Sequence, residues 1–358
     1  MSRSVQSLLA IAVLIAAGAA ARPGSTSAAG APRIAVLWAG GDVMPVQATA
    51  TVIAAHGPDH LFAELTALLR QGDVAFANVE APLTSRGDPT AGKVTDDVRA
   101  GRDYVFRGSP RVAGALRRAG VLTVSLANNH AMDYGAAGLL DTLAQLRAAG
   151  VAAVGAGATL ADARRPHIVE IHGLRVAFLA YSDVLPRRSV ATATSPGIAP
   201  AKGTWTGRPA EDEIADDVRG ARRRADHVVV SVHWGDELQI QPNCRQVALS
   251  RRILAAGATV ILGHHPHVLQ PIVVGSHRLV AYSLGNLIAS PRSRLARESA
   301  LLRVELGPAG VVGWSARPLL LQAGRPRPAD IETAAAIAKR LTVPVVCRQV
   351  PQGARVNP

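Results

Sequence analysis

The chain has 358 residues, of which 48% are hydrophobic and 18% are charged, a composition that supports a large folded core and excludes a disordered chain. Aromatic residues contribute only 3%, so the core must consist mainly of aliphatic side chains. The net charge of +13 reflects either arginines scattered over the surface or attraction to an anionic partner. A nucleic-acid partner is not expected, because no dense Lys/Arg run is interleaved with aromatic residues.

The N-terminus is typical of an export signal. A short positive start precedes an apolar run from Ser7 to Ala21, and small residues suited to cleavage follow. The run is short for a membrane span, so we expect residues 1–31 to be a cleaved signal peptide and spacer, with an uncleaved anchor as the alternative. No Cys follows the run, which excludes lipid attachment at a cleavage-site Cys. The protein is therefore expected to be extracytoplasmic, either secreted or associated with the cell envelope.

Residues 32–343 alternate between apolar runs and helical segments and are expected to form one domain, followed by a flexible tail at 344–358. This alternation predicts a layered α/β architecture. Polar loops are expected at 85–102 and 183–208. Strands are predicted over 33–39, 73–79, 121–126, 151–154, 175–181, 227–232, 258–262, 279–283, 300–306 and 311–321, and helices over 61–70, 110–119, 139–149, 211–224, 245–256 and 330–341.

The two cysteines, Cys244 and Cys347, belong to no CxxC or zinc-binding pattern. In an oxidising compartment they could form a disulfide. The sequence does not say whether they lie close together, so paired and free thiols both stay open.

Polar residues follow five of the apolar runs, and in open α/β sheets ligand sites form at the carboxyl ends of strands. Each segment alone is weak evidence, because a Gly-Asp is often a turn and an Asn-His is often a cap. In the last segment, we expect His265 and His267 to point the same way as alternate residues of an extended chain, with His264 pointing away. The five segments are Gly41-Asp42, Asn78-Val79-Glu80, Asn128-Asn129-His130, Val232-His233-Trp234-Gly235 and Gly263-His264-His265-Pro266-His267.

This mixture of donors matches the needs of a dinuclear metal site. Two divalent ions about 3.5–4 Å apart require a bridging carboxylate to offset their repulsion. Neutral imidazoles and an amide oxygen then complete the coordination without adding charge. The five segments together predict a site for two divalent ions, either Mn, Fe or Zn.

Seven stretches carry a more specific pattern: GGDVMP (40–45), FANVEAPLT (76–84), SLANNHAMDYGAAGLLDTL (125–143), VGAGATLADARRP (154–166), VSVHWGDE (230–237), LGHHPHVLQP (262–271) and AYSLGN (281–286). In these stretches the chain resembles the CapA (poly-γ-glutamate capsule synthesis) family of the calcineurin-like metallophosphoesterase superfamily. The resemblance extends from about Ile34 to about Asn286. It implies a metallophosphatase-like sandwich of two mixed β-sheets flanked by helices.

The resemblance also implies roles for individual residues. His130 would be the acid that protonates a leaving group. Asp133 would orient His130 or the adjacent loop, or else cap a turn or helix start. Asn78, Trp234 and Asn286 are candidate substrate-contacting residues, with core packing as the alternative for Trp234. The implied metal ligands are Asp42, Glu80, Asn129, His233, His265 and His267, with Glu80 bridging the two ions.

Two positions depart from the usual metallophosphatase pattern. The first motif is normally Asp-x-His, but here it is Asp42-Val43-Met44, and a thioether is a poor donor for a hard or borderline ion. The usual bridging Asp is replaced by Glu80. Other CapA relatives share both changes, so the first metal position has one imidazole fewer than in the wider superfamily.

The resemblance implies a protein of capsule or poly-γ-glutamate biosynthesis or processing. As a dinuclear hydrolase or transferase, it would use a metal-bridging hydroxide on poly-γ-glutamate, another anionic polymer or a phosphorylated substrate. The loop at 183–208, with Arg187, Arg188, Lys202 and Arg208, could clamp an anionic polymer or simply be solvated. The first alternative is a non-catalytic polymer-binding accessory working with membrane capsule-synthesis proteins. The second is a metallophosphodiesterase, although no base pocket is recognisable.

Overall fold

The computed structural model describes residues 33–89, 104–184 and 186–347, apart from the side chain of Arg187. The expected signal peptide at 1–31 and the last eleven residues of the expected tail therefore lie outside the described residues. The described ranges all belong to one unit, Arg33–Pro358. No helix within these ranges is both long and apolar enough to cross a membrane.

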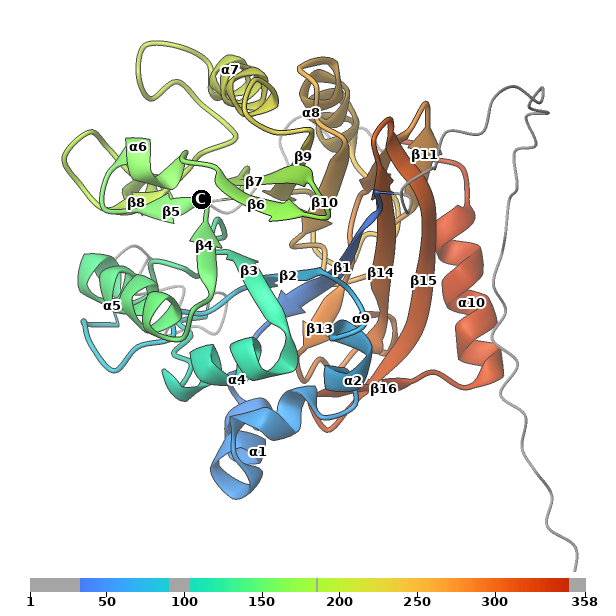
Figure 1. The fold of residues 1–358 in the computed structure, drawn as a ribbon. Coiled ribbons are helices and arrows are strands. Elements are labelled where there is room, and N and C mark those ends of the chain that lie inside the picture. Colours follow the sequence, from blue (N-terminus) through green and yellow to red (C-terminus); the bar gives the residue numbers. More distant parts are fainter. Residues whose placement is uncertain (1–32, 90–103, 185, 348–358) are drawn as a thin grey trace, which may run out of the picture. The chain divides into compact units, whose positions relative to one another are not determined.

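Two mixed β-sheets form the centre of this unit (Figure 1). The first has the order β16-β15-β14-β1-β2-β3-β4, with β13 also paired to β1. It contains β1 (Ala35–Val43), β2 (Val74–Val79), β3 (Val121–Ser125), β4 (Ala152–Val154), β13 (Asn286–Ile288), β14 (Glu298–Gly307), β15 (Gly310–Gln322) and β16 (Arg325–Pro328).

The second sheet has the order β11-β12-β10-β9-β7-β6. Its four inner strands are parallel, and its two edge strands are antiparallel to their neighbours. It contains β6 (His167–Ile171), β7 (Leu174–Ser182), β9 (His227–His233), β10 (Val260–His264), β11 (Ile272–Gly275) and β12 (Arg278–Ala281), and a separate short pair joins β5 (Ala156–Gly157) to β8 (Gly197–Ile198).

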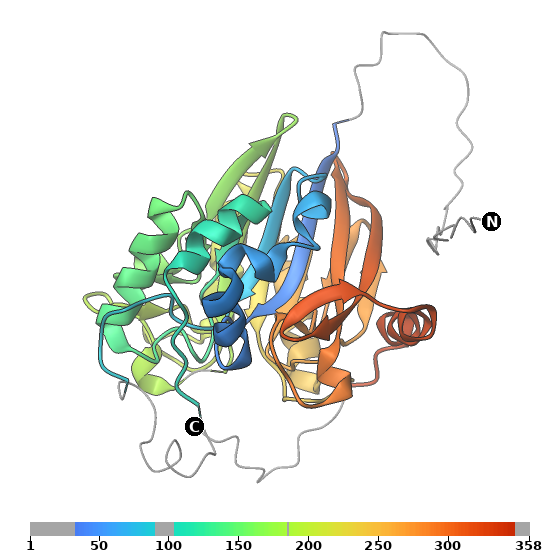
Figure 2. The same cartoon turned by 90° about the horizontal axis from the view of Figure 1, so that it is seen from below.

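Helices cover the outer faces of both sheets (Figure 1). The first sheet carries α1 (Ala48–His56), η1 (Pro58–Phe62), α2 (Thr66–Leu69), α4 (Arg111–Ala119) and α5 (Gly135–Ala148), and the second carries α7 (Ala210–Arg222) and α8 (Cys244–Ala255). The helix α10 (Ile331–Thr342), red in Figure 2, lies beside β14 and β15. The shorter elements are α6 (Leu160–Ala163), η2 (Arg187–Ser189) and α9 (Arg294–Arg297).

Strand alternation explains why three apolar layers form. On β2, Phe76 faces the core between the sheets, whereas its neighbours Ala75 and Ala77 face the helices. On β7, Phe178 faces the same inter-sheet core, and its ring stacks on Phe76 with centroids 5.8 Å apart. Successive strand residues point to opposite faces, so a strand that is apolar on both sides must be covered on both sides. The expected sandwich of two mixed sheets flanked by helices is confirmed.

Several elements differ from the sequence prediction. The helix expected over 61–70 is split into η1 and α2, although Leu61, Leu65 and Leu69 are all buried at a helical spacing. The unpredicted helix α1 has no clear apolar stripe. Strand β11 was not predicted, since three of its four residues are exposed at a sheet edge, and an edge strand need not show apolar alternation.

Strand β1 continues past the expected end at residue 39 and passes very close to the turn before β13. A Cβ at Gly41 would lie 2.0 Å from the carbonyl oxygen of Gly285. Only glycine fits there, because any side chain would overlap backbone atoms that cannot rotate away. This close approach lets Asp42 pair in register with Asn286.

The two cysteines form a disulfide, which resolves the question that the sequence left open. The bond ties the start of α8 to the residues that follow α10. Val345 packs on the apolar layer outside the second sheet, and the Val346 N–H donates to Gln241 Oε1 at 3.2 Å. Residues 344–347, the first part of the expected tail, are thus attached to the domain.

We predict that Gly41→Ala lowers the free energy of unfolding by about 1–3 kcal/mol, because the added methyl group has no space. Gly275→Ala is the matched control, since no heavy atom lies within 4 Å of a Cβ built at Gly275. Urea denaturation measures both variants. Equal stability of Gly41→Ala and Gly275→Ala would contradict this prediction and would show that the backbone around Gly41 can move to accept a methyl group.

Removal of the disulfide should also destabilise the protein, because the bond connects residues separated by 103 positions. We expect Cys347→Ser to lower the free energy of unfolding by about 2–4 kcal/mol through the larger conformational entropy of the unfolded chain. Denaturation with and without reductant measures the effect. The double variant Cys244→Ser/Cys347→Ser should be insensitive to reductant, and a wild-type protein equally insensitive would contradict the prediction.

Candidate metal centre

The carboxyl ends of strands from both sheets meet at one place. In the first sheet, Asp42 on β1 pairs in register with Asn78 on β2 and with Asn286 on β13. In the second, His233 at the end of β9 pairs with His264 at the end of β10. Residues in register on parallel neighbours point to the same side of a sheet, so strand pairing alone groups these polar side chains.

Asp42 is the residue that connects the two groups. Its Oδ1 accepts a hydrogen bond of 2.8 Å from Asn78 Nδ2 and lies 3.2 Å from His264 Nδ1. Its Oδ2 lies 3.2 Å from His267 Nδ1 and accepts from the backbone N–H of His265 at 3.3 Å. Burial alone would raise the pKa of Asp42, but the hydrogen bonds from His264 and His267 hold it well below its usual value.

Glu80, directly after β2, occupies the middle of the cluster and is fully buried. Its Oε1 lies 3.4 Å from His233 Nε2 and 3.7 Å from His267 Nε2. The same His233 nitrogen lies 2.9 Å from Asn129 Oδ1. Glu80 therefore faces two different sets of neighbours, as a bridging carboxylate must.

These donors form two overlapping groups that could each hold a metal ion. One contains Glu80, His233 and His265, and the other contains Asp42, Glu80 and His267, with the ligand atoms of each group within 4.8 Å of one another. His265 Nδ1 is buried and has no hydrogen-bond partner among the described residues. A buried polar atom without a partner is costly, and a bound metal ion is one way to satisfy it. The donor set thus fits two divalent ions.

The pKa values of His265 and His267 are shifted in opposite directions. Burial, followed by the charge of His267, lowers the pKa of His265 to about 3. Burial also disfavours the charged form of His267, but the carboxylates of Glu80 and Asp42 outweigh it and raise the pKa of His267 to about 10. His265 is therefore neutral and ready to act as a ligand, whereas a metal ion at His267 must displace a proton.

Asp133 contacts both His130 and the segment beside it. Its Oδ2 lies 2.8 Å from His130 Nδ1 and also accepts from the backbone N–H of Phe106 at 2.6 Å. The Phe106 ring stacks on His130 with centroids 4.1 Å apart. The residue directly before α5 is Tyr134. These contacts favour the prediction that Asp133 orients His130 and the adjacent segment.

Asn78 and Asn286 are fully buried beside the metal-ligand cluster. Asn78 donates to Asp42, and Asn286 Oδ1 lies 3.0 Å from His267 Nδ1. Asn128, to which the sequence assigned no role, donates to Asn78 Oδ1 at 3.1 Å and to the Val79 carbonyl at 2.8 Å. All three amides therefore position neighbouring groups of the cluster, and substrate contact by Asn78 and Asn286 stays a prediction.

The Trp234 side chain is packed in the apolar layer outside the second sheet. It is only 1% exposed, and its indole N–H donates to the Tyr282 carbonyl at 2.9 Å. His233 faces the metal-ligand cluster, so the next residue turns toward the opposite layer. The packing alternative for Trp234 is the one that the structure supports.

The prediction for the last segment was wrong in its geometry. His264 does not point away, because its register with His233 brings its ring to Asp42. His265 and His267 do not alternate along an extended chain, since β10 ends at His264 and both residues have positive φ angles, 92° and 56°. A strained turn rather than strand alternation brings these two imidazoles together.

Sequence reasoning also missed Glu237, an exposed residue four positions after His233. One of its carboxylate oxygens and one nitrogen each of His265 and His267 lie within 4.8 Å of one another. The only signal for it was its place at the end of the VSVHWGDE stretch.

The loop at 183–208 contains the short elements η2 and β8, and the side chain of its Arg187 lies outside the described part of the chain. Arg208 pairs with Asp216 at 2.8 Å, whereas Arg188 and Lys202 are exposed. Its role as a clamp for an anionic polymer stays a prediction.

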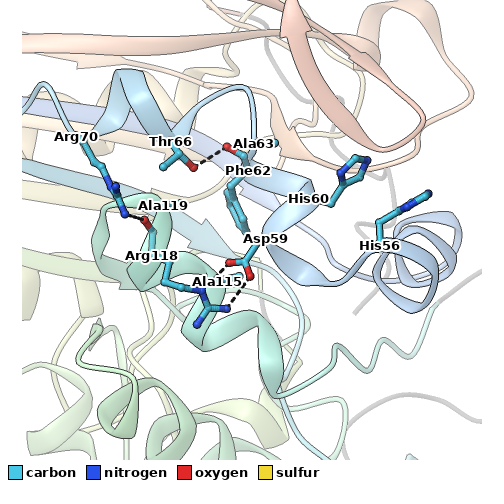
Figure 3. A pocket seen from close by; sticks show the side chains of 10 residues that line it. All are labelled: His56, Asp59, His60, Phe62, Ala63, Thr66, Arg70, Ala115, Arg118 and Ala119. Carbon is cyan, nitrogen blue, oxygen red and sulfur yellow. Dashed lines mark hydrogen bonds and ion pairs between the residues drawn. The ribbon is translucent and has the colours of Figure 1, made fainter.

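A depression of about 340 Å³ lies elsewhere, between η1, α2 and α4 (Figure 3). Arg118 pairs there with both carboxylate oxygens of Asp59, at 2.8 and 3.0 Å. Arg70 donates to the Arg118 carbonyl at 2.7 Å. These polar groups satisfy one another and connect η1 and α2 to α4, and none of the metal-centre residues lines this depression.

We predict that Asp133→Ala releases His130 and lowers the free energy of unfolding by about 1–3 kcal/mol, because one buried and one partly buried donor lose their acceptor. In the wild type, the ¹⁵N signals of His130 should correspond to a ring protonated on Nδ1, and in the variant to mixed tautomers. Asp133→Asn retains one acceptor oxygen and should have a smaller effect. An unchanged His130 spectrum in Asp133→Ala would contradict the orienting role.

Comparison with known proteins gives a consistent result. The family model "Bacterial capsule synthesis protein PGA_cap" matches residues 36–291. The chain is 31% identical to "Capsule biosynthesis protein CapA" of Bacillus anthracis, over 80% of this chain and 68% of that protein. It is also 31% identical to "PGA biosynthesis protein CapA" of Bacillus subtilis (strain 168), over 80% and 72%. A "Probable polyglutamine synthesis accessory protein" of Mycobacterium tuberculosis is 32% identical over 60% of this chain and 55% of its own length. This chain therefore belongs to the PGA_cap family of bacterial capsule synthesis proteins, as the CapA proteins do.

Proposed function

We propose that this protein is an exported, metal-dependent hydrolase or transferase that processes poly-γ-glutamate or a similar anionic polymer of the cell envelope. The observation that carries the proposal is the buried set of donors that shares Glu80 and includes the unpartnered Nδ1 of His265. A protein that only binds a polymer has little use for such a set, because burying charged groups together with a polar nitrogen that has no described partner is costly.

The residues that would hold two divalent ions divide into two positions. Asp42, Glu80 and His267 would form the first, and Glu80, Asn129, His233 and His265 the second. When bound, the ions would activate a water molecule and stabilise negative charge on the reacting group. Mn, Fe and Zn all suit this mixture of oxygen and nitrogen donors.

His130 is proposed as the acid that protonates the leaving group. Its Nδ1 lies 2.8 Å from Asp133 Oδ2, and in the doubly protonated imidazolium the proton on Nε2 would be the one transferred. The stacked Phe106 ring limits rotation of the imidazole and covers one of its faces. His130 is close enough to the metal-ligand cluster for its charge to contribute to the lowered pKa of His265. With a γ-glutamyl polymer, the group protonated would be the departing amine.

Three features support the substrate class and the location. The two Bacillus relatives are named for capsule and PGA biosynthesis. The net charge of +13 suits a polyanion. The disulfide between Cys244 and Cys347 suits an oxidising compartment outside the cytoplasm, in agreement with the export signal expected at residues 1–31.

One observation favours a second candidate, a non-catalytic accessory of an envelope synthesis complex that acts with membrane proteins. The Mycobacterium relative carries the word "accessory" in its name. Met44 also stands where the wider superfamily has a histidine ligand. Loss of one donor could weaken the first metal position enough to abolish turnover while the polymer still binds.

The first test is the metal content of the purified protein. We expect about two divalent ions per chain, with losses in His233→Ala and His265→Ala. The control is His56→Ala, which removes an exposed imidazole at the end of α1 and should change nothing. Absence of bound metal after incubation with Mn²⁺, Fe²⁺ or Zn²⁺ would contradict the enzyme proposal.

The second part of the test is turnover. We expect the metal-loaded protein to release amines from poly-γ-glutamate, and we expect His130→Ala to lower kcat by about 10²–10⁴-fold. A phosphodiester substrate tests the phosphodiesterase alternative in parallel. Bound metal without turnover of either substrate would favour the accessory role.

A further inference from the structure

We propose that Glu237 is an additional metal ligand, which completes the position formed by Asp42, Glu80 and His267. This inference rests on the proposed metal-dependent function and concerns a residue outside the ligand set that the family resemblance implies. It also assigns different chemistry to the two positions.

The backbone holds Glu237 beside the strained histidine turn. The N–H of the next residue, Leu238, donates to the Pro266 carbonyl at 2.8 Å, and Pro266 lies between His265 and His267. On the other side, Asp236 Oδ2 accepts from Asn243 Nδ2 at 3.1 Å at the start of α8. Both chain neighbours of Glu237 are thus anchored, so the approach of its carboxylate to the imidazoles is built into the fold.

The ligand groups overlap at the two histidines. Glu237 shares a group with His265 and His267, whose ligand atoms lie within 4.8 Å of one another. His267 also belongs to the group with Asp42 and Glu80, and His265 also belongs to the group with Glu80 and His233.

The number of donors favours the group of Asp42, Glu80 and His267. The group of His233 and His265 has four donors once Glu80 and Asn129 are counted. The group of Asp42, Glu80 and His267 has only three. The carboxylate of Glu237 would raise the number of donors in this group to four.

The additional carboxylate changes the expected metal preference. Three carboxylates and one imidazole form an oxygen-rich position that suits Mn²⁺ or Mg²⁺, whereas two imidazoles, an amide and a carboxylate suit Zn²⁺ or Fe²⁺. Among the described residues, Glu237 is also the one exposed member of the groups that could hold a metal. It would therefore be the ligand on the solvent side, where an ion enters.

The test measures Mn²⁺ binding to the metal-free mature protein. Isothermal titration calorimetry gives the number and affinity of the bound ions, and EPR reports the environment of the bound Mn²⁺. We expect Glu237→Gln to weaken one of two Mn²⁺ equivalents by about tenfold or more and to leave the other unchanged. The matched control is Glu332→Gln, which removes the same charge from an exposed position on α10. The double variant Asp42→Asn/Glu237→Gln should lose no further equivalent beyond Asp42→Asn.

The outcomes separate this inference from the proposed function. If wild type and Glu237→Gln both bind two Mn²⁺ ions with equal affinity, Glu237 is not a ligand, and the metal-dependent function stands. If the wild type binds no metal, both proposals fall together. Thermal melts of the metal-free variants verify folding, which the exposed position of Glu237 should leave intact.

Discussion

The buried carboxylate of Asp42 is the interaction on which the rest of the centre depends. It accepts from Asn78 in its own sheet and contacts the histidine turn that follows β10 in the other sheet. An isolated carboxylate at this depth would cost several kcal/mol, and paired and hydrogen-bonded it can remain ionised. The two sheets therefore cannot separate or shift relative to each other without removing the partners of this buried charge.

The packing around Asp42 leaves little freedom for change. Gly41 is in contact with the backbone before β13, and a Cβ at Gly263 would lie 1.9 Å from the Tyr282 carbonyl oxygen. These close approaches bring the ends of β1 and β10 within reach of their neighbours. The Phe76–Phe178 stack joins the two sheets in the inter-sheet core. The packing of the core and the placement of the metal-ligand side chains therefore depend on each other.

The polar residues of the centre divide into donors and supports. Three asparagines orient neighbouring groups through hydrogen bonds, namely Asn78, Asn128 and Asn286. The Asp133 carboxylate contacts His130. Supporting hydrogen bonds of this kind fix ligand orientation and tune affinity. Glu237 differs from these buried residues, because it is the exposed member of the described groups that could hold a metal.

The sequence by itself determined most strands and helices of a layered α/β architecture and the polar residues at strand ends, because apolar alternation and strand termini are local signals. The sandwich of two sheets came from the resemblance to the CapA family. The sequence also identified Asp42, Glu80 and the histidines as donors. Only the tertiary structure decided that His264 turns toward Asp42, that Glu237 approaches the histidine turn and that Cys244 reaches Cys347. Those contacts depend on the relative placement of two sheets and on positive φ angles after β10, and no local residue pattern encodes either.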